Sequence, residues 1–570
     1  MAMASTLAAP SIARAETPSL HGEANVTVLS QSGVVASDHP TASAMGAEVL
    51  RRGGTAADAG VATLLALGVL NPFASGLGGG GFCLYRRASD GDSVALDFRE
   101  IAPASATRDM YVDRKTKEVD RDASRTGGKA VGVPGEAAGL AALHARYGAL
   151  DWAEVVRPAR SLAQRGFYVG ELLPKRLARS AEKLDAAGGF RAAFAPGGDW
   201  VAHQDVLERP DLGKTLLALE TQGPRAFYEG PIAEAIVASV RATGGSMTLK
   251  DLATYAVEER APLRGTYRGH ELLTMPPPSS GGIVIIQVLN ILSGFDLASM
   301  GYGPAAVHLV VEGLKHAFAD RARWLGDADF VKVPVARLIS TAYADTLRAR
   351  IDPKATGELD SYGSDKPPRD DSGTSHVSIV DARGDMLACT STVNTSFGAK
   401  VYVPEFGITL NNEMDDFSAQ PGVPNAYGLV GNEQNAIAPG KRPLSSMSPT
   451  LVLRDDAPFM AVGASGGPTI ITGTLLAILR VIDFGFSPRD AITSPRIHHQ
   501  WLPHRLFVEP GDARLDGLDA FGHEVDVRPA FNSVQMVVRR DDGAWEGVSD
   551  PRKLGRPANQ GPSPDKEQTR

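Results

Sequence analysis

Cysteine is almost absent from this chain of 570 residues, which contains only two. These two, Cys83 and Cys389, are too few for a disulfide scaffold and match no metal-ligand spacing, so cysteine usage does not indicate the redox compartment. Long apolar runs are missing as well. The longest, residues 61–70 and 469–479, fall short of the roughly 18 residues that span a bilayer, so we expect the mature protein to be soluble.

A strong charge bias is also lacking. The formal net charge is -8, and the 58 Lys and Arg residues are scattered rather than banded. This distribution argues against nucleic acid or an anionic membrane as a partner and favours a small-molecule substrate. Hydrophobic residues make up 43% and charged residues 22%, which is ordinary globular usage, and no Pro-, Ser- and Gly-rich stretch divides the chain. We therefore expect one compact unit.

The first 15 residues are small and apolar and end in an A-x-A-like site, but they lack a basic segment. We interpret residues 1–15 as a weak export signal, which would make the protein periplasmic or secreted. A disordered N-terminal tail is the alternative.

Hydrophobic periodicity predicts a mainly helical first part and a strand-rich last part. Helices are expected within residues 41–70, 134–251, 304–325 and 470–480. Strands are expected at residues 82–86, 94–98, 407–410, 450–453 and 459–463.

Residues 366–373 are polar and turn-prone and form the clearest linker. Residues 375–380 and 386–394 have strand character and are joined by turn-forming residues, which predicts a β-hairpin. We expect a new sheet to begin at Thr374.

Two glycine motifs suggest other chemistries. Gly76, Gly78 and Gly81 fit the dinucleotide pattern GxGxxG, but a helix precedes them and a strand follows, which is the reverse of the required order. We interpret these glycines as sites of close backbone packing.

Residues 463–467 fit GxSxG, the nucleophile motif of α/β-hydrolases, with Ser465 as the nucleophile. A strand precedes it and a helix follows, as that fold requires. Possible acid and histidine partners occur later in the required order, so order alone leaves this alternative open. They are Asp483, Asp490, His498, His499, His504 and His523.

Thr374 would gain a base if it became the first residue of a chain. Its own α-amino group, with a pKa of about 8 in model compounds, could take the proton from its own hydroxyl. The same hydroxyl could first attack the carbonyl of Gly373 and break the peptide bond between them, because glycine tolerates the strained backbone required. For an isolated Gly-Thr pair, an ordinary strand-initiating threonine is the alternative.

The surroundings of Thr374 and several segments of the first half are similar to one known family. The matching segments are TSHVSIVD (374–381), TVNTSFG (392–398), LNNEMDDF (410–417), PLSSMSPT (443–450), LGGGGF (77–82), LDFRE (96–100) and MPPPSSGG (275–282). From about residue 33 to residue 553, in order, the chain resembles the γ-glutamyltransferase family.

The resemblance implies an N-terminal nucleophile hydrolase fold of the α+β class, a four-layer αββα sandwich in which two stacked antiparallel sheets lie between helical layers. It also implies autocleavage into a large subunit, residues 16–373, and a small subunit, residues 374–570, which together form one compact unit. The activity implied is cleavage of γ-glutamyl amides such as glutathione, through a γ-glutamyl ester resolved by water or by the amine of an amino acid or peptide. No metal or cofactor is implied.

The resemblance also assigns roles to individual residues. Thr374 is the nucleophile, Thr392 orients its amine, and Gly466 and Gly467 supply the N–H groups that stabilise the oxyanion. A γ-glutamyl group carries an α-carboxylate and an α-ammonium, so its pocket needs partners for both charges. The carboxylate partners are Arg99, Ser445 and Ser446; the ammonium partners are Asn394, Glu413 and Asp416; and Tyr427 lies at the tip of a covering loop.

Three alternatives stay open at this point. One is a glutaryl β-lactam acylase of the same family, against which Glu413, Asp416 and Tyr427 argue. Another is an α/β-hydrolase that uses Ser465. The last is an uncleaved binding protein that keeps the pocket without the chemistry.

Overall fold

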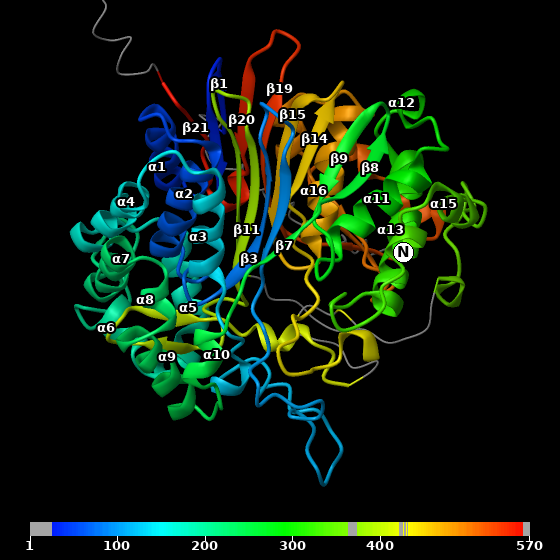
Figure 1. The fold of residues 1–570 in the computed structure, drawn as a ribbon. Coiled ribbons are helices and arrows are strands. Elements are labelled where there is room, and N and C mark those ends of the chain that lie inside the picture. The colour runs from blue at the N-terminus through cyan, green and yellow to red at the C-terminus, as the bar shows by residue number, and fades with distance from the viewer. Residues whose placement is uncertain (1–25, 363–372, 421–425, 427–428, 430, 562–570) are drawn as a thin grey trace, which may run out of the picture.

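Two stacked antiparallel sheets form the centre of the molecule (Figure 1). The computed structural model describes residues 26–362, 373–420, 426, 429 and 431–561. The first sheet has the strand order β1-β20-β19-β15-β14-β9-β8, with β1 Thr27–Ser30, β20 Trp545–Ser549, β19 Ser533–Arg539, β15 Ala457–Ser465, β14 Thr450–Arg454, β9 His270–Thr274 and β8 Leu263–Tyr267. The second has the order β21-β2-β10-β11-β3-β4-β7, with β21 Ala558–Asn559, β2 Val34–Ser37, β10 Gly373–Val380, β11 Met386–Asn394, β3 Gly80–Arg86, β4 Ser93–Phe98 and β7 Glu258–Arg260.

Helices cover the outer face of each sheet, so the expected αββα sandwich is confirmed (Figure 1). The flank of the second sheet carries α1 Pro40–Arg51, α2 Ala56–Leu70, α3 Glu136–Tyr147, α4 Trp152–Arg165, α5 Leu172–Ala187, α6 Phe190–Phe194, α7 Pro210–Gln222, α8 Arg225–Tyr228, α9 Pro231–Ala242 and α10 Leu249–Ala253. The flank of the first sheet carries α11 Gly281–Leu292, α12 Leu297–Met300, α13 Pro304–Trp324, α14 Val335–Leu338, α15 Thr341–Arg348, α16 Thr469–Ile482 and α17 Pro488–Thr493. Small peripheral strands are β5 Phe167–Tyr168, β6 Val206–Leu207, β12 Val401–Val403, β13 Ile408–Leu410, β16 Ile497–His498, β17 Leu506–Val508 and β18 Val525–Val527.

The central strands are apolar on both faces because both faces are buried. On β11, Leu387 and Cys389 point into the core beneath the α1–α2 flank, whereas Met386 and Ala388 belong to the core shared with the other sheet. Side chains alternate between the faces of a strand, so one short segment contributes to both cores. This double burial holds the hairpin rigidly in place.

The predicted hairpin is confirmed, because β10 and β11 pair antiparallel along their length. The turn between them is held by Asp381, whose carboxylate accepts from the backbone N–H of Arg383 and Asp385 and, 2.9 Å away, from Ala56 at the start of α2. The helices expected at 41–70, 304–325 and 470–480 are also present. Of the linker 366–373, only Gly373 lies within the described residues, and the signal-like segment 1–15 lies outside them.

The expectation that a new sheet begins at Thr374 is wrong. Strand β10 inserts between β2 and β11, and β11 pairs in turn with β3, so strands from before and after Thr374 belong to one sheet. Pairing between strands more than 300 residues apart leaves no local pattern, and the hairpin signal alone therefore suggested an independent sheet. The strand expected at 407–410 forms, as β13, but pairs only with β12 outside both large sheets.

The glycines of the GxGxxG pattern serve backbone packing, as interpreted from their order. A Cβ atom added to Gly78 would lie 2.1 Å from the carbonyl oxygen of Thr409, and one added to Gly81 would lie 2.2 Å from that of Thr390. Neither distance is possible for a real side chain, so only glycine lets these backbones meet.

Cys83 and Cys389 form a disulfide, which the sequence did not indicate. They lie opposite each other on neighbouring strands β3 and β11 and are both fully buried. Their separation of 306 residues along the chain explains why the pairing is invisible locally. Among the described helices, none is both long and apolar enough to cross a membrane.

Candidate active site

The β10–β11 hairpin places three of the expected residues side by side. Thr374 pairs with Thr392 in register, and the register shifts between Gly373 and Thr374, where Gly373 faces Asn394. Asn394 adopts a left-handed backbone conformation, with φ of 74°, which asparagine tolerates better than most residues. At this irregularity, Thr374, Thr392 and Asn394 lie together at the end of the hairpin.

The Gly373 carbonyl is held by two hydroxyl groups. Its oxygen lies 2.8 Å from Oγ1 of Thr374 and 2.7 Å from Oγ1 of Thr392. The two hydroxyl oxygens are 3.2 Å apart, and Thr392 also accepts from the backbone N–H of Asn394 at 2.8 Å. The Thr374 hydroxyl, the carbonyl before it and the Thr392 hydroxyl therefore form one buried hydrogen-bonded group.

Arg99 lies at the end of β4 and is almost fully buried, with 1% of its side chain exposed. One of its terminal nitrogens pairs with Glu413, and the other lies 2.6 Å from Asp416 Oδ2. Both carboxylates come from the short 3-10 helix η3, Glu413–Asp416, directly after β13. The cation and two anions expected to recognise a substrate thus pair with one another in the free pocket.

Burial and mutual attraction oppose each other in this ion cluster. Burial raises the pKa of Glu413 well above its usual range and raises that of Asp416, with Arg99 opposing both shifts. Burial disfavours the charge of Arg99, but Glu413 and Asp416 outweigh it and raise the pKa of the guanidinium. Arg99 is therefore the fixed cation, and the carboxylates keep their charge only while a cation lies beside them.

Ser445 and Ser446 lie in the segment that leads to β14. The backbone of Ser445 is held by Pro278 and Ser280, with N–H···O distances of 2.9 and 2.8 Å. Behind Ser446, Arg321 of α13 lies 3.4 Å from the Ser446 hydroxyl and 2.9 Å from that of Ser280. Burial lowers the pKa of Arg321 to about 10, so it stays charged near neutral pH.

Gly466 and Gly467 form the turn from β15 to α16. Their φ angles are 137° and 59°, a conformation that favours glycine. Among the described residues, no acceptor takes a hydrogen bond from either backbone N–H. This leaves two donors at the turn, where Gly467 lines the same pocket as Thr374.

The α/β-hydrolase alternative through Ser465 is not supported. The Ser465 hydroxyl is 2.6 Å from Lys553 Nζ and 3.5 Å from the carbonyl oxygen of Ser533, and no described histidine bonds to it. Both large sheets are antiparallel, whereas the α/β-hydrolase fold is built on a mostly parallel sheet. The GxSxG match arises because a strand-to-helix turn needs glycines here.

One pocket collects nearly all the residues expected from the sequence. It is lined by Arg99, Thr374, Thr392, Asn394, Glu413, Asp416, Ser445, Ser446 and Gly467, together with Leu429, Met447, Pro468 and Ile470. Gly466 and Gly373 adjoin it through their chain neighbours, and Tyr427 lies outside the described residues. The cavity is about 20 Å³ in this arrangement, in which Arg99 pairs with both acids.

Sequence reasoning missed three charged residues around this pocket: Arg321, Glu100 and Lys553. Glu100 lies 3.9 Å from Arg99, and burial raises its pKa to about 8 even though Arg99 opposes the shift. Lys553 bonds to the backbone carbonyl of Thr374. Glu100 directly follows Arg99 in the segment LDFRE, but nothing in the local sequence of the other two indicates that they are buried here.

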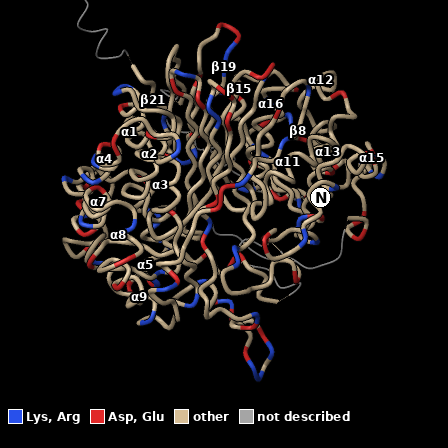
Figure 2. The backbone as a smooth tube through the Cα atoms, in the orientation of Figure 1, with Lys and Arg blue, Asp and Glu red and all other residues tan. Residues whose placement is uncertain are grey.

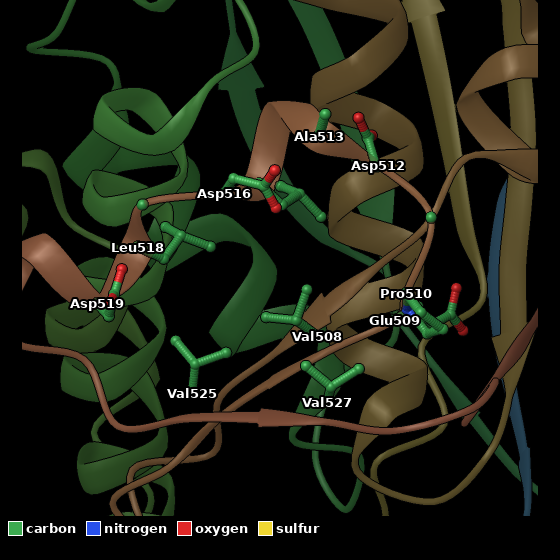
Figure 3. Close-up of a pocket in the computed structure, with 13 residues that line it drawn as sticks. Val508, Glu509, Pro510, Asp512, Ala513, Asp516, Leu518, Asp519, Val525 and Val527 are labelled. Atoms are coloured by element: carbon green, nitrogen blue, oxygen red, sulfur yellow. The ribbon is translucent and has the colours of Figure 1, made fainter. Parts of the chain in front are cut away.

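Two other features lie apart from the pocket. A wider pocket of about 730 Å³ is lined by residues 508–513 and 515–519, Val525 and Val527 and includes none of the site residues (Figure 3). His308, Glu312 and His523 bring possible metal-ligand atoms within 4.8 Å of one another. Glu312, however, already pairs with the Lys315 ammonium at 2.9 Å, so a cation of the chain itself occupies this place.

Elsewhere in the molecule, charges of both signs are interspersed along the backbone (Figure 2).

Comparison with known proteins agrees with this geometry. The family model described as Gamma-glutamyltranspeptidase matches residues 42–559. The "Glutathione hydrolase proenzyme" of Escherichia coli (strain K12) is 44% identical over 532 residues, which cover 92% of this chain and 91% of that protein.

Two solved structures are similar over different lengths. The cephalosporin acylase from Bacillus halodurans has a TM-score of 0.84 at 28% identity, covering 97% of this chain and 99% of that one. A chain of the Helicobacter pylori gamma-glutamyltranspeptidase has a TM-score of 0.55 at 40% identity, covering 56% of this chain and 91% of that one. With the family model matching nearly the whole described length, the chain belongs to the gamma-glutamyltranspeptidase family.

Proposed function

We propose that this chain is an autoprocessed γ-glutamyltransferase that cleaves γ-glutamyl amides such as glutathione. The observation that carries the proposal is the charge arrangement of the pocket. A buried guanidinium faces two carboxylates, Glu413 and Asp416, in the cavity that contains the Thr374 hydroxyl. An arrangement of one cation and two anions matches a zwitterionic ligand.

Self-cleavage would begin at the hydrogen-bonded group around Gly373. Thr392 donates to the Gly373 carbonyl oxygen and so makes its carbon more electrophilic. Oγ1 of Thr374 attacks that carbon and the C–N bond breaks, so the hydroxyl proton goes to the nitrogen and an ester forms. Water then hydrolyses the ester, leaving a Gly373 carboxylate and a free Thr374 amine. The products are a large subunit, residues 16–373, and a small subunit, residues 374–570.

Donor binding would exchange ion pairs rather than create unpaired charges. The α-carboxylate of a γ-glutamyl group takes the place of the acids at Arg99, with Ser445 and Ser446 as additional donors. Its α-ammonium pairs with Asp416 and Glu413, and Asn394 completes this side. Each buried group keeps a partner of opposite charge, which is why a zwitterion can enter so closed a site.

Turnover would use only groups of the chain. The Thr374 amine takes the proton from its own hydroxyl as Oγ1 attacks the γ-carbonyl, and the N–H groups of Gly466 and Gly467 stabilise the oxyanion. The amine then protonates the leaving nitrogen, and a γ-glutamyl ester remains. Water, or an amino acid or peptide amine, resolves the ester and restores Thr374. We assign Tyr427 to the loop that covers the donor.

An acylase for glutaryl amides is the second candidate, since a cephalosporin acylase is among the similar structures. A glutaryl group has a carboxylate but no ammonium. Its carboxylate would pair with Arg99 in place of Glu413 and Asp416. Those two carboxylates would then stay buried without a cation, which is costly. The same pocket therefore favours the γ-glutamyl donor.

The test combines processing with donor and acceptor choice. N-terminal sequencing of the smaller fragment should begin at Thr374. γ-Glutamyl p-nitroanilide should be cleaved at least about 100-fold more efficiently than glutaryl p-nitroanilide, because only the former supplies an ammonium to the buried acids. Glycylglycine should accelerate release of p-nitroaniline if transfer competes with hydrolysis. An uncleaved but active chain, or equal use of both anilides, would refute the proposal.

The disulfide gives a further expected result. The proposed cleavage before Thr374 leaves Cys83 and Cys389 on different fragments, so their bond would join the two subunits covalently. We expect one band on a denaturing gel without reductant and two bands with it, and two bands under both conditions for Cys83→Ser. Separation of the wild-type fragments without reductant would contradict this. The disulfide also supports a periplasmic or secreted location, where such bonds persist.

A further inference from the structure

We infer that Lys553 is a positioning residue that sets both the placement and the basicity of the Thr374 amine. This inference rests on the proposed function, since the amine exists only after cleavage before Thr374. Lys553 ends the 3-10 helix η7, Pro551–Lys553, almost at the end of the described chain. It is 179 residues from Thr374 in sequence, yet it bonds directly to the Thr374 carbonyl oxygen.

Three acceptors surround the Lys553 ammonium. Besides the Thr374 carbonyl, Nζ lies 2.6 Å from Ser465 Oγ and 3.4 Å from Asp38 Oδ2. An ammonium has three N–H donors and no acceptor, so these contacts match its protonated form. Burial lowers the pKa of Lys553, while Asp38 opposes that shift.

The contacts of Lys553 tie the nucleophile to the oxyanion site. After cleavage, Thr374 has no preceding residue and is joined covalently to the strand only through its carbonyl carbon. Lys553 bonds to that carbonyl and also to Ser465, the residue directly before Gly466. One side chain thus fixes the distance between the two halves of the catalytic machinery.

The charge of Lys553 also lies close to the future amine. The nitrogen and carbonyl oxygen of one residue are no more than about 3.6 Å apart, so Nζ lies within about 6 Å of the Thr374 nitrogen. A cation at that distance disfavours protonation of the amine. The amine is then free to act as a base at lower pH than an ordinary N-terminus.

Other charged groups face this region but do not supply the same effect. Asp38 is already engaged by the backbone N–H of His376, by Ser533 and by Gln535. On the pocket side, Arg99 carries one positive charge and pairs directly with two carboxylates, those of Glu413 and Asp416. Other charged or titratable groups near Thr374 or Lys553, among the described residues, include Glu100, Arg176, Asp550, Arg321, Glu171, Arg556, His39, His203 and His376. Of these, His39 and His376 are neutral because burial lowers their pKa values to about 4 and about 3.

The test is the pH profile of kcat/KM for γ-glutamyl p-nitroanilide, measured on cleaved protein. The acidic limb reports deprotonation of the amine in the free enzyme. Lys553→Gln keeps a hydrogen-bond donor but removes the charge and exposes the amine to Asp38, so the limb should move up by about one pH unit. Lys553→Arg should keep it within a few tenths of a unit.

Asp38→Asn provides the opposite change. It removes an anion near the amine, so the limb should move down. A uniform loss of kcat/KM in Lys553→Gln, with the limb unmoved, would overturn the inference and leave Lys553 a structural residue. If Lys553→Gln is not cleaved, Asp38→Asn decides by the direction of its shift, and an unmoved limb there overturns the inference. Failure of the proposed function is distinct, because wild-type protein would then not begin a fragment at Thr374.

Discussion

A Thr374→Ala variant is expected to remain one uncleaved chain and to release no measurable p-nitroaniline from γ-glutamyl p-nitroanilide. Removing this one oxygen atom abolishes both self-cleavage and turnover of the substrate. The methyl group of alanine cannot attack the Gly373 carbonyl, which lies within hydrogen-bond reach of Oγ1 in the native chain. Without that step no free amine forms, so neither nucleophile nor base exists. The loss should reach the background rate, as when a residue that acts as part of a unit is removed.

The matched comparison for this result is Ser465→Ala. Ser465 is equally buried and lies in the competing nucleophile motif, but it bonds to Lys553 rather than to a histidine. We expect Ser465→Ala to be cleaved before Thr374 and to keep measurable turnover, reduced only by the loss of one Lys553 contact. A denaturing gel with reductant and the anilide assay measure both outcomes. If the serine variant were inactive and the threonine variant active, the assignment of the nucleophile would be wrong.

Arg99→Gln is expected to reduce kcat/KM for γ-glutamyl p-nitroanilide by about 1,000-fold, or about 4 kcal/mol, the typical cost of removing one partner from a buried ion pair. Among the described residues, Arg99 is the cation that pairs with both Glu413 and Asp416, and the change removes it. Those carboxylates would take up protons, since burial already raises their pKa values. The pocket would then lose the partner for the donor carboxylate and weaken the partners for its ammonium.

Arg99→Lys is the control for this prediction. It keeps a positive charge but loses the fork that reaches two carboxylates at once, so we expect an intermediate loss of about 10- to 100-fold. Thermal unfolding of both variants separates a binding defect from a folding defect. A loss of less than about fivefold in Arg99→Gln would place donor recognition elsewhere, since charged groups that are truly buried and paired cost more to remove.

Local patterns predicted the elements well where each element carries its own signal. The helices α1, α2, α13 and α16 follow hydrophobic spacing, and the β10–β11 hairpin follows two apolar runs with a turn between them. The αββα architecture came from the family resemblance rather than from these patterns. Neighbouring residues along the chain sufficed for the elements because their geometry depends on spacing over a few residues.

The order of the strands within the sheets could not be predicted from local patterns. Strand β2 has four residues and no alternation of polar and apolar side chains, yet it pairs with β10 more than 300 residues later. Both faces of these strands are buried, so their apolar runs do not indicate which strands are neighbours. The same lack of local signal concealed the bond between Cys83 and Cys389.

The sequence by itself, through its family resemblance, predicted which residues surround the candidate nucleophile. It also predicted that these residues form a pocket for a zwitterion. Only the tertiary structure decided that Arg99 pairs with Glu413 and Asp416 in the free pocket, that Ser465 has no histidine, and that Lys553 bonds to the Thr374 carbonyl. Residue identity sets what a group can do, whereas charge pairing and basicity depend on distances between segments far apart in the chain.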